Sequence, residues 1–149
     1  MAKFIGVKMI EATPMRASMA LSAGYKIGNA HPDDMGYEVT YPDGYKSWSP
    51  AKEFEKAYYK LEDPAGDVLK ENDIKRFIKD IENVKVGTKT TNTTLTCLTG
   101  FEVHGQAACV KPENFDLNVG SNYARIKAED KIWEGLGFVL QWAKYGLKK

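Results

Sequence analysis

The sequence lacks any apolar run that approaches the roughly 20 residues needed to cross a lipid bilayer. Its first residues also lack the pattern of a secretory signal, because Glu11 interrupts the apolar stretch early. We therefore expect a cytoplasmic protein with no membrane partner.

The sequence also lacks an excess of charge of either sign. It has 21 basic and 20 acidic side chains, for a formal net charge of +1. Proteins that bind long nucleic acid usually carry a large basic excess, since affinity comes from neutralising many phosphates. Long nucleic acid is therefore excluded as a partner, whereas a small anion needs only a few well-placed cations.

Metal-ligating side chains are scarce. The cysteines are Cys97 and Cys109, and the histidines are His31 and His104. Their spacing matches no usual metal motif, so we predict no metal site and no cofactor. Both cysteines lie in apolar, strand-like segments, and in a cytosolic chain they are expected to be buried structural thiols.

Motifs for common enzyme chemistry are absent as well. The chain has no G-x-S-x-G elbow, no Walker-type phosphate loop and no Cys–His pair in a recognisable context. Its many carboxylates are scattered on polar helix faces. We therefore predict no catalytic residues and no enzymatic activity, which is consistent with a protein that only binds.

What is present indicates a globular α+β protein. Hydrophobic residues make up 43% of the 149 positions and charged residues 28%. A polar stretch with Pro64 and Gly66 suggests a linker at residues 62–71, between modules at 1–61 and 72–149. We expect a small antiparallel sheet packed with helices in each module, and a long helix near the C-terminus.

The N-terminal module is predicted to contain two helices and three strands. Pro42-Asp43-Gly44 is a hairpin signal, and Ser49 and Pro50 suit the cap and first position of a helix. The expected elements are a strand at 3–10, a helix at 15–22, strands at 37–41 and 45–48, and a helix at 50–61.

The C-terminal module is predicted to begin with a helix at 72–83, in which Ile74, Phe77, Ile78 and Ile81 face inward. A strand region follows at 84–86. The threonine-rich segment 89–98 favours a strand, and Thr99-Gly100 is expected to turn it directly into a strand at 101–110.

That two-residue turn would set the hairpin register. It would place Leu98 opposite Phe101 and Thr96 opposite Val103, with these four side chains on one sheet face. The other face would then carry Cys97, Glu102, His104 and Gln106.

The helix that follows is expected to start at Asn114 or Asp116, either of which could cap it. It should continue to about Trp133. Residues 134–137 contain two glycines and are expected to interrupt it before a last short helix at 138–145.

Short elements in this half resemble those of a family of phage accessory proteins. They are Gly100-Phe101, Ala107-Ala108-Cys109-Val110, Pro112-Glu113-Asn114-Phe115-Asp116, Gly120, Ala124, Lys131-Ile132-Trp133, Gly135 and Phe138. In the family they correspond to an N-G-F turn, a strand ending near A-C-V, a P-x-N-F-D loop and a helix ending in K-I-W. The resemblance covers about residues 72–145. Thr99 replaces the usual Asn, and Leu136-Gly137 shifts the glycine before the last helix.

The resembling family includes the Thoeris anti-defence sponges. Those members bind glycocyclic ADP-ribose, the signal made by TIR-domain enzymes, and some bind cyclic oligonucleotides from cGAS-like enzymes. The resemblance implies a homo-oligomer that holds a small cyclic nucleotide, without cleaving it, in the cytoplasm of an infected bacterium. Residues 3–59 resemble a separate phage module of no known activity, through segments such as 3–8, 12–15 and 44–50.

A cyclic nucleotide of this kind needs cations for its phosphates, a stacking surface and a few hydrogen-bonding groups. Beyond the N-terminal module the only arginines are Arg76 and Arg125, and each could contact a phosphate with two N–H groups. The full set of candidate ligand-binding residues is Arg125, Phe101, His104, Asn114, Tyr123, Lys127 and Arg76.

Each candidate also has a purely structural interpretation. Arg125 could pair with Glu129, four residues along the same helix, and Phe101 could be a core residue. His104 could be an ordinary exposed histidine, and Asn114 a helix cap. Trp133 is expected in the core or a dimer interface.

Two other functions remain open at the level of sequence. Aromatic surfaces would also suit an interaction module that inhibits a host protein. The third function is weak nucleotide hydrolysis, which differs from sequestration because the nucleotide would not be recovered intact.

Overall fold

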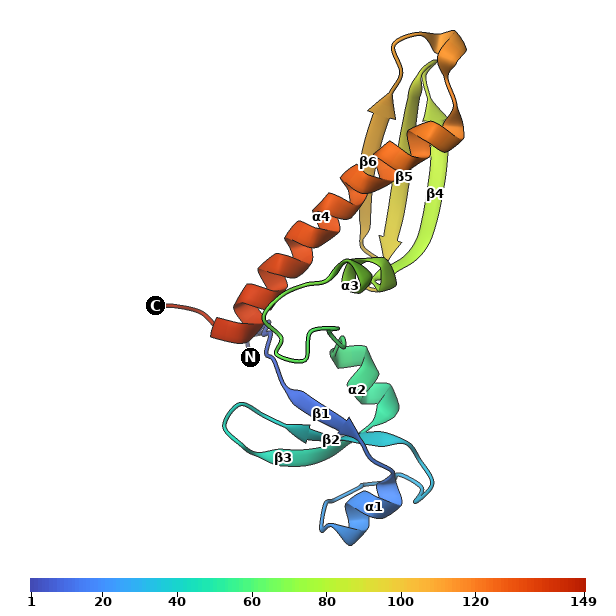
Figure 1. Ribbon diagram of the computed structural model, residues 1–149. Coiled ribbons are helices and arrows are strands. Elements are labelled where there is room, and N and C mark those ends of the chain that lie inside the picture. The colour runs from blue at the N-terminus through green and yellow to red at the C-terminus, as the bar shows by residue number, and fades with distance from the viewer. The chain divides into compact units, whose positions relative to one another are not determined.

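The computed structural model describes residues 1–149, and these form two compact units. Unit 1 comprises Met1–Lys60 with Trp142–Lys149, and unit 2 comprises Leu61–Gln141. Each unit contains a three-stranded antiparallel sheet with helices packed on it, which confirms the predicted α+β class (Figure 1). No helix is long and apolar enough to span a membrane.

The sheet of unit 1 has the order β1-β2-β3. Its strands are β1 (Glu11–Pro14), β2 (Gly36–Thr40) and β3 (Lys46–Pro50). The predicted hairpin is confirmed, because Thr40 pairs with Lys46 and the Tyr41 N–H donates to the Tyr45 carbonyl at 2.9 Å. Gly44 closes the turn with a φ of +89°, a conformation that glycine adopts without steric cost.

The two helices of this unit pack on opposite faces of the sheet. Helix α1 (Ala17–Ser22) packs against Trp48, whose indole N–H donates to the Met15 carbonyl at 2.8 Å. Helix α2 (Ala51–Ala57) packs on the other face through Phe54, whose ring stacks on Tyr37 with centroids 4.2 Å apart.

Two expectations for unit 1 are wrong. The first strand is at residues 11–14 rather than 3–10, because only the later segment finds a partner in β2; Phe4 and Ile5 stay exposed. Ser49 does not cap α2, and Pro50 is not its first residue. Both belong to β3, so the helix begins only at Ala51.

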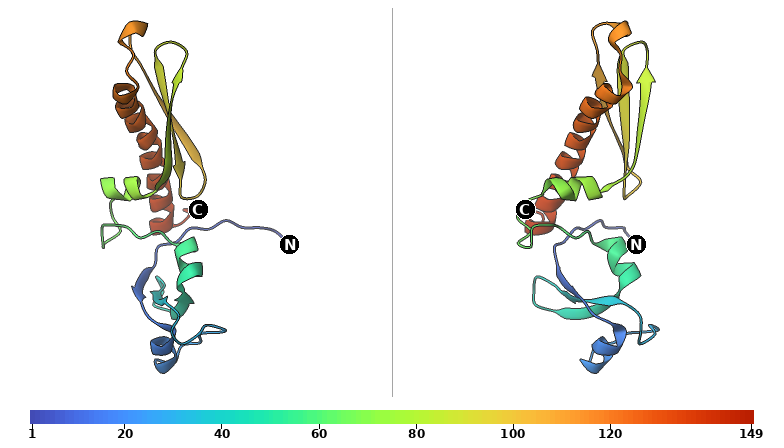
Figure 2. Two further views of the ribbon diagram at one scale, coloured as in Figure 1. Left: turned by 90° about the vertical axis from the view of Figure 1, so that its right-hand side faces the viewer. Right: turned by 45° about the vertical axis from the view of Figure 1, so that its right-hand side comes forward.

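The sheet of unit 2 has the order β4-β5-β6. Its strands are β4 (Ile78–Val86), β5 (Thr90–Cys97) and β6 (Glu102–Ala108), preceded by helix α3 (Glu71–Arg76). Helix α4 (Leu117–Tyr145) lies along one face of this sheet, as the views of Figure 2 agree. A short 3₁₀ turn, η1 (Pro112–Asn114), precedes it.

Small residues let α4 approach the sheet closely. Gly105 of β6 packs so near Ala124 and Ala128 that an added Cβ would overlap the helix backbone. Gly120 packs in the same way against Thr91. The core then consists of apolar side chains from α3, the sheet and α4: Ile74, Leu95, Cys97, Val103, Ala128 and Ile132.

The predicted helix at 72–83 is wrong beyond Arg76. Ile74 is buried as expected, but residues 78–86 form a strand, and Ile81 is 50% exposed. The segment carries apolar residues at spacings that suit a helix and does not alternate, yet it pairs along the length of β5. Backbone pairing with a distant strand outweighs a weak local preference.

The predicted hairpin register is also wrong. Thr96 lies opposite Glu102 and Leu95 opposite Val103, and Cys97 donates its N–H to the Phe101 carbonyl at 2.8 Å. The turn therefore has three residues, ending at Gly100 with a φ of +86°. This one-residue difference moves Cys97 to the buried face and Thr96 to the open one, because side chains alternate along a strand.

Helix α4 is continuous, so the interruption predicted at residues 134–137 is wrong. Gly135 and Gly137 both keep helical backbone geometry, which glycine disfavours by about 1 kcal/mol relative to alanine but does not forbid. Ile132 and Leu136 pack with the core on either side of Gly135 and hold this turn of the helix in place.

Candidate functional site

The start of α4 is set by Asp116. Its side chain accepts the N–H groups of Asn118 at 2.9 Å and Val119 at 3.2 Å, which identifies the cap among the two predicted candidates. Asn114 instead belongs to η1 and is exposed. Its side-chain amide is thus free of the capping role and open to solvent.

Three candidate residues project from α4 in two directions. Successive residues of an α-helix are turned by about 100°, so positions two apart lie about 160° from each other around the axis. Arg125 is two positions from both Tyr123 and Lys127. Tyr123 and Lys127 therefore share one side of α4, and Arg125 lies on the other.

Arg125 forms an ion pair with Glu129. Its Nε lies 3.2 Å from the Glu129 carboxylate, and the arginine side chain is 45% exposed. The predicted intrahelical pair is therefore confirmed. The Glu129 side chain is only 14% exposed, so solvent screens this pair less than it screens an ion pair between two surface residues. The exposed part of the guanidinium is open to solvent.

Phe101 is an exposed aromatic residue at the end of the β5–β6 turn. Its side chain is 70% exposed, so the interpretation as a core residue is wrong. The Thr99 hydroxyl accepts the Phe101 N–H at 3.2 Å and Gly100 precedes it in the turn. The ring is presented on a constrained backbone and is free to stack on a planar ligand.

His104 belongs to a chain of polar side chains on the open face of the sheet. Its Nδ1 lies 2.9 Å from the Thr94 hydroxyl, which also accepts from Asn92 at 3.3 Å. The Asn92 amide oxygen in turn accepts from Gln106 at 3.3 Å. These contacts orient four hydrogen-bonding groups across β5 and β6, on the face that α4 does not cover.

Arg76 forms an ion pair with the buried side chain of Asp73. It donates to the Asp73 carboxylate at 2.8 Å, and this fully buried carboxylate also accepts the backbone N–H groups of Glu62 and Lys70 at 2.9 and 2.8 Å. A buried carboxylate requires such partners, because burial of an unpaired charge costs several kcal/mol. The position of Arg76 is thus explained by folding.

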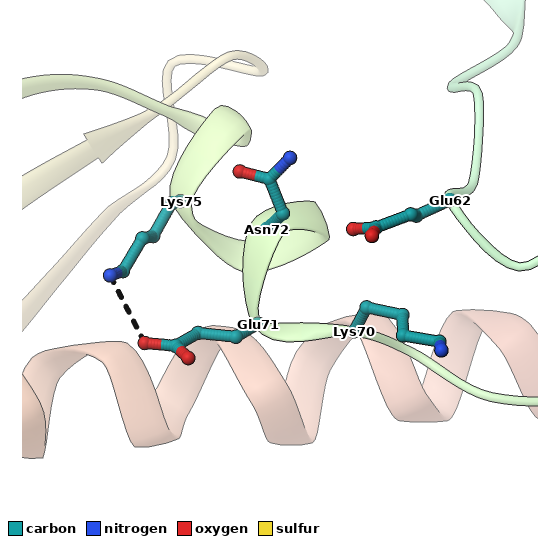
Figure 3. A pocket seen from close by; sticks show the side chains of 5 residues that line it. All are labelled: Glu62, Lys70, Glu71, Asn72 and Lys75. Carbon is teal, nitrogen blue, oxygen red and sulfur yellow. Dashed lines mark ion pairs between the residues drawn. The ribbon is translucent and has the colours of Figure 1, made fainter.

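An open hollow of about 320 Å³ lies beside α3. It is lined by Glu62, Lys70, Glu71, Asn72 and Lys75, and Figure 3 shows the Glu71–Lys75 ion pair, 3.0 Å long, at its edge. None of the seven candidate ligand-binding residues lines it. Its two lysines face two glutamates, so it carries no net charge to attract an anion.

The seven candidates do not converge on one pocket in a single chain. Lys127 lies against Gly105, the neighbour of His104, but His104 projects from the opposite face of the sheet. No hydrogen bond or ion pair joins any two candidates. The arrangement offers separate binding groups on several surfaces of unit 2.

Two features of unit 2 were missed by sequence reasoning. The Asp73 cluster joins positions up to 11 residues apart, and the Asn92–Gln106 pair joins two strands. The alternation of polar residues in β5 and β6 indicates that Asn92 and Gln106 lie on the open face of the sheet. Only the correct register, however, places the two amides opposite each other.

The two thiols lie in different surroundings. Burial raises the pKa of the Cys97 thiol, which keeps it protonated at neutral pH. Cys109 is only partly buried, contrary to expectation, and its thiol lies 3.1 Å from the Lys111 carbonyl. No cluster of His, Cys, Asp or Glu in the 149 residues could hold a metal ion.

The sequence matches one family model, that of the phage protein (N4 Gp49/phage Sf6 gene 66) family. The match covers residues 69–143, which is half of the chain, from the start of α3 into the last turns of α4. The chain belongs to this family of phage proteins. The family segment thus contains β4-β5-β6 and all seven candidate residues. No curated protein and no solved structure matches the chain.

Proposed function

We propose that this phage protein binds and sequesters a small cyclic nucleotide immune signal, such as glycocyclic ADP-ribose or a cyclic oligonucleotide, without cleaving it. The observation that carries the proposal is the family match, because it covers the segment in which the sponge-like motifs lie. Binding of this kind would counter host defence in the cytoplasm of the infected bacterium.

The side chains of unit 2 supply the chemistry that such a ligand needs. Arg125 and Lys127 are exposed cations for the phosphates, and Phe101 and Tyr123 are 70% and 62% exposed aromatic rings for stacking on a purine. His104 and Asn114 add hydrogen-bonding groups. Arg76 contributes less, since Asp73 already engages its guanidinium.

The placement of these groups favours a site shared between chains. Arg125 and Tyr123 lie on opposite sides of α4, and a ligand of this size cannot wrap around a helix about 10 Å in diameter. A pocket that uses both therefore draws them from different copies of the protein. Homo-oligomerisation is accordingly part of the proposal.

The proposal is tested by calorimetry of the full chain against glycocyclic ADP-ribose and a panel of cyclic oligonucleotides. Binding followed by recovery of intact nucleotide after heat denaturation is the expected result. Recovery of a cleaved nucleotide would show hydrolysis instead, and flat traces with every nucleotide would refute ligand binding.

Arg125→Ala is expected to weaken nucleotide binding at least about tenfold, since a charged hydrogen bond to phosphate contributes roughly 1.5–3 kcal/mol. Its melting temperature is expected to fall slightly, because Glu129, which is only 14% exposed, loses its cation. Arg16→Ala removes an exposed arginine from unit 1 and is the matched control. Equal affinity in the two variants would discard Arg125 as a ligand residue.

A second candidate function is inhibition of a host protein through an aromatic surface. It is favoured by the exposure of Tyr123, Trp133 and Phe138 on α4, at 62, 37 and 72%. Co-purification of one host protein in stoichiometric amount, without nucleotide binding, would support this function over sequestration.

A further inference from the structure

Unit 1 contains an open hollow at the loop between β2 and β3, which projects from one end of the sheet (Figure 1). Its volume is about 510 Å³, larger than that of the hollow beside α3. It is lined by Lys8, Tyr41, Pro42, Asp43 and Tyr45. None of these residues belongs to the core around Trp48 and α1, so the packing of that core does not account for them.

Backbone hydrogen bonds hold the loop in one conformation. The Tyr41 N–H donates to the Tyr45 carbonyl at 2.9 Å, and the Gly44 N–H donates to the Tyr41 carbonyl at 2.8 Å. The Tyr45 N–H donates to Oδ1 of Asp43 at 2.9 Å. The rings of Tyr41 and Tyr45 stack with centroids 5.9 Å apart. Side chains ordered in this way lose less conformational entropy when a ligand binds.

The N-terminal segment adds a cation to the hollow. The Lys8 Nζ lies 4.9 Å from the centroid of the Tyr41 ring, whose π face attracts an ammonium group. The Met9 N–H donates to the Ala143 carbonyl at 3.2 Å, which anchors the backbone beside Lys8. Lys8 is exposed and forms no ion pair, so its N–H groups are open to an anion.

Tyr45 and Asp43 supply the other open groups. The Tyr45 side chain is 65% exposed, and its hydroxyl has no hydrogen-bond partner. Asp43 is exposed and forms no ion pair. Only its Oδ1 is hydrogen-bonded, and each carboxylate oxygen has two acceptor sites, so both oxygens can accept from a ligand. The hollow therefore combines an exposed ring, a cation and a double acceptor.

These three groups match the three parts of a guanosine nucleotide. Guanine presents N1–H and N2–H side by side, and a carboxylate can accept both with its two oxygens. Adenine has an acceptor at N1 instead, which would face the carboxylate with a lone pair. A purine ring stacks on a phenol, and a phosphate pairs with an ammonium group.

We infer that the hollow of unit 1 binds guanosine 5′-monophosphate (GMP). Tyr45 stacks on the base, Asp43 accepts from N1–H and N2–H, and Lys8 pairs with the phosphate. One cation suits a single nucleotide, since a long strand would need many. The site uses side chains of unit 1 alone, so it is independent of the nucleotide site proposed for unit 2.

The experiment is calorimetry of the full chain with GMP, inosine 5′-monophosphate (IMP) and adenosine 5′-monophosphate (AMP). GMP should bind at least about tenfold more tightly than AMP, because AMP leaves the carboxylate without donors. IMP keeps N1–H but lacks the amino group, so its affinity should lie between the two. No binding of GMP, or equal affinities for GMP and AMP, would overturn the proposal.

Asp43→Asn tests how the base is recognised. Asparagine suits the same turn and keeps an oxygen for the Tyr45 N–H, so the loop should be retained. Affinity for GMP should fall at least about tenfold, while affinity for AMP should not fall. Glu53→Gln removes an exposed carboxylate of α2 and is the matched control. Equal losses for GMP and AMP in Asp43→Asn would contradict the proposed contact.

Lys8→Gln tests the phosphate contact. It should weaken GMP and AMP by the same factor, at least about tenfold, and leave guanosine unaffected because the nucleoside has no phosphate. Lys52→Gln, which removes an exposed lysine of α2, is the control. A loss that is equally large for guanosine would refute the role of Lys8.

Two further variants test the stacking and the location of the site. Tyr45→Ala should weaken GMP about tenfold, whereas Tyr45→Phe keeps the ring and the affinity. Arg125→Ala should leave GMP binding unchanged, since Arg125 belongs to unit 2. Loss of GMP binding in Arg125→Ala would overturn this site. Failure to bind GMP, with cyclic nucleotides still bound, would refute this inference and leave the proposed function intact.

Discussion

The two units build similar sheets and stabilise them by different means. In unit 1 one large side chain, Trp48, fills the space between α1 and the sheet and makes a hydrogen bond to Met15. In unit 2 two glycines bring α4 close to the strands: Gly105 lies against the helix backbone at Ala124 and Ala128, and Gly120 lies against the Thr91 side chain. The comparison shows two ways to hold a helix on a sheet: one buried ring at α1, and glycines at the points of closest contact along α4.

The largest expected effect is from alanine at the closest backbone contacts. In unit 2, Gly105→Ala forces a Cβ into the Ala124 carbonyl, which cannot move without displacing α4; we expect a loss of about 3 kcal/mol in the free energy of unfolding. In unit 1, Gly36→Ala overlaps the Trp48 ring and lies 2.5 Å from the Ser49 carbonyl oxygen, with a similar loss.

Denaturant unfolding measures both losses, and hydrogen exchange locates each in its own unit. Gly6→Ala is the control, since its added Cβ meets no atom within 4 Å. A stable Gly105→Ala protein would show that unit 2 does not depend on close contact between helix and strand.

Asp73→Asn should have the next largest effect, a loss of about 2 kcal/mol. The buried Asp73 carboxylate of unit 2 accepts hydrogen bonds from Glu62, Lys70 and Arg76. In asparagine one of the two oxygens becomes an NH₂ group, which cannot accept from these N–H donors. Urea unfolding measures the change, with Glu71→Gln as the control because that acid is exposed and pairs only with Lys75 on its own helix. A loss no greater than that of Glu71→Gln would contradict the role of Asp73 as an organising acceptor.

Thr91→Val should stabilise unit 2 by about 1 kcal/mol. The Thr91 hydroxyl is buried against Gly120 without a hydrogen-bond partner, and a valine of nearly the same shape removes that unpaired polar group. Thr93→Val is the contrasting variant, because the Thr93 hydroxyl donates to Asn83 at 2.5 Å and its removal should destabilise. Equal melting temperatures for the two variants would oppose this account.

The smallest expected effect is on the stability of the protein at alkaline pH, and it arises in unit 1. In unit 1 the pKa of Tyr25 is raised by its hydrogen bond to Glu38, and that of Tyr37 by its bond to Glu55. A phenol whose pKa is raised by folding stabilises the folded state below its ordinary pKa of 10.0, and this contribution is lost as the pH rises beyond it.

The Tyr25→Phe, Tyr37→Phe double variant should therefore show a shallower fall in melting temperature between pH 9 and 11 than the wild-type protein. Thermal melts across this range test the prediction. Parallel curves for the two proteins would show that neither hydrogen bond contributes to the pH dependence.

Sequence reasoning succeeded where a few neighbouring residues decide the structure. The Pro42-Asp43-Gly44 turn, the capping by Asp116 and the Arg125–Glu129 pair each involve residues at most four apart. It failed for residues 78–86, whose local apolar spacing suits a helix although the segment pairs with β5 as a strand. The candidates on α3, β6 and α4 were placed on the correct kind of element, whereas Phe101 lies in the turn and Asn114 in η1. The directions of the side chains around α4 and across the sheet depended on register.

The chain by itself determined the α+β class, the hairpin at Pro42-Asp43-Gly44 and the near-neutral charge, because composition and short-range contacts carry that information. Only the tertiary structure decided that β4 is a strand, that Cys97 shares a sheet face with Leu95 and Val103, and that α4 continues through Gly135 and Gly137. These outcomes depend on partners distant in sequence, such as β5 for β4 and the core around Ile132 for α4, whose pairing and burial energies exceed local preference.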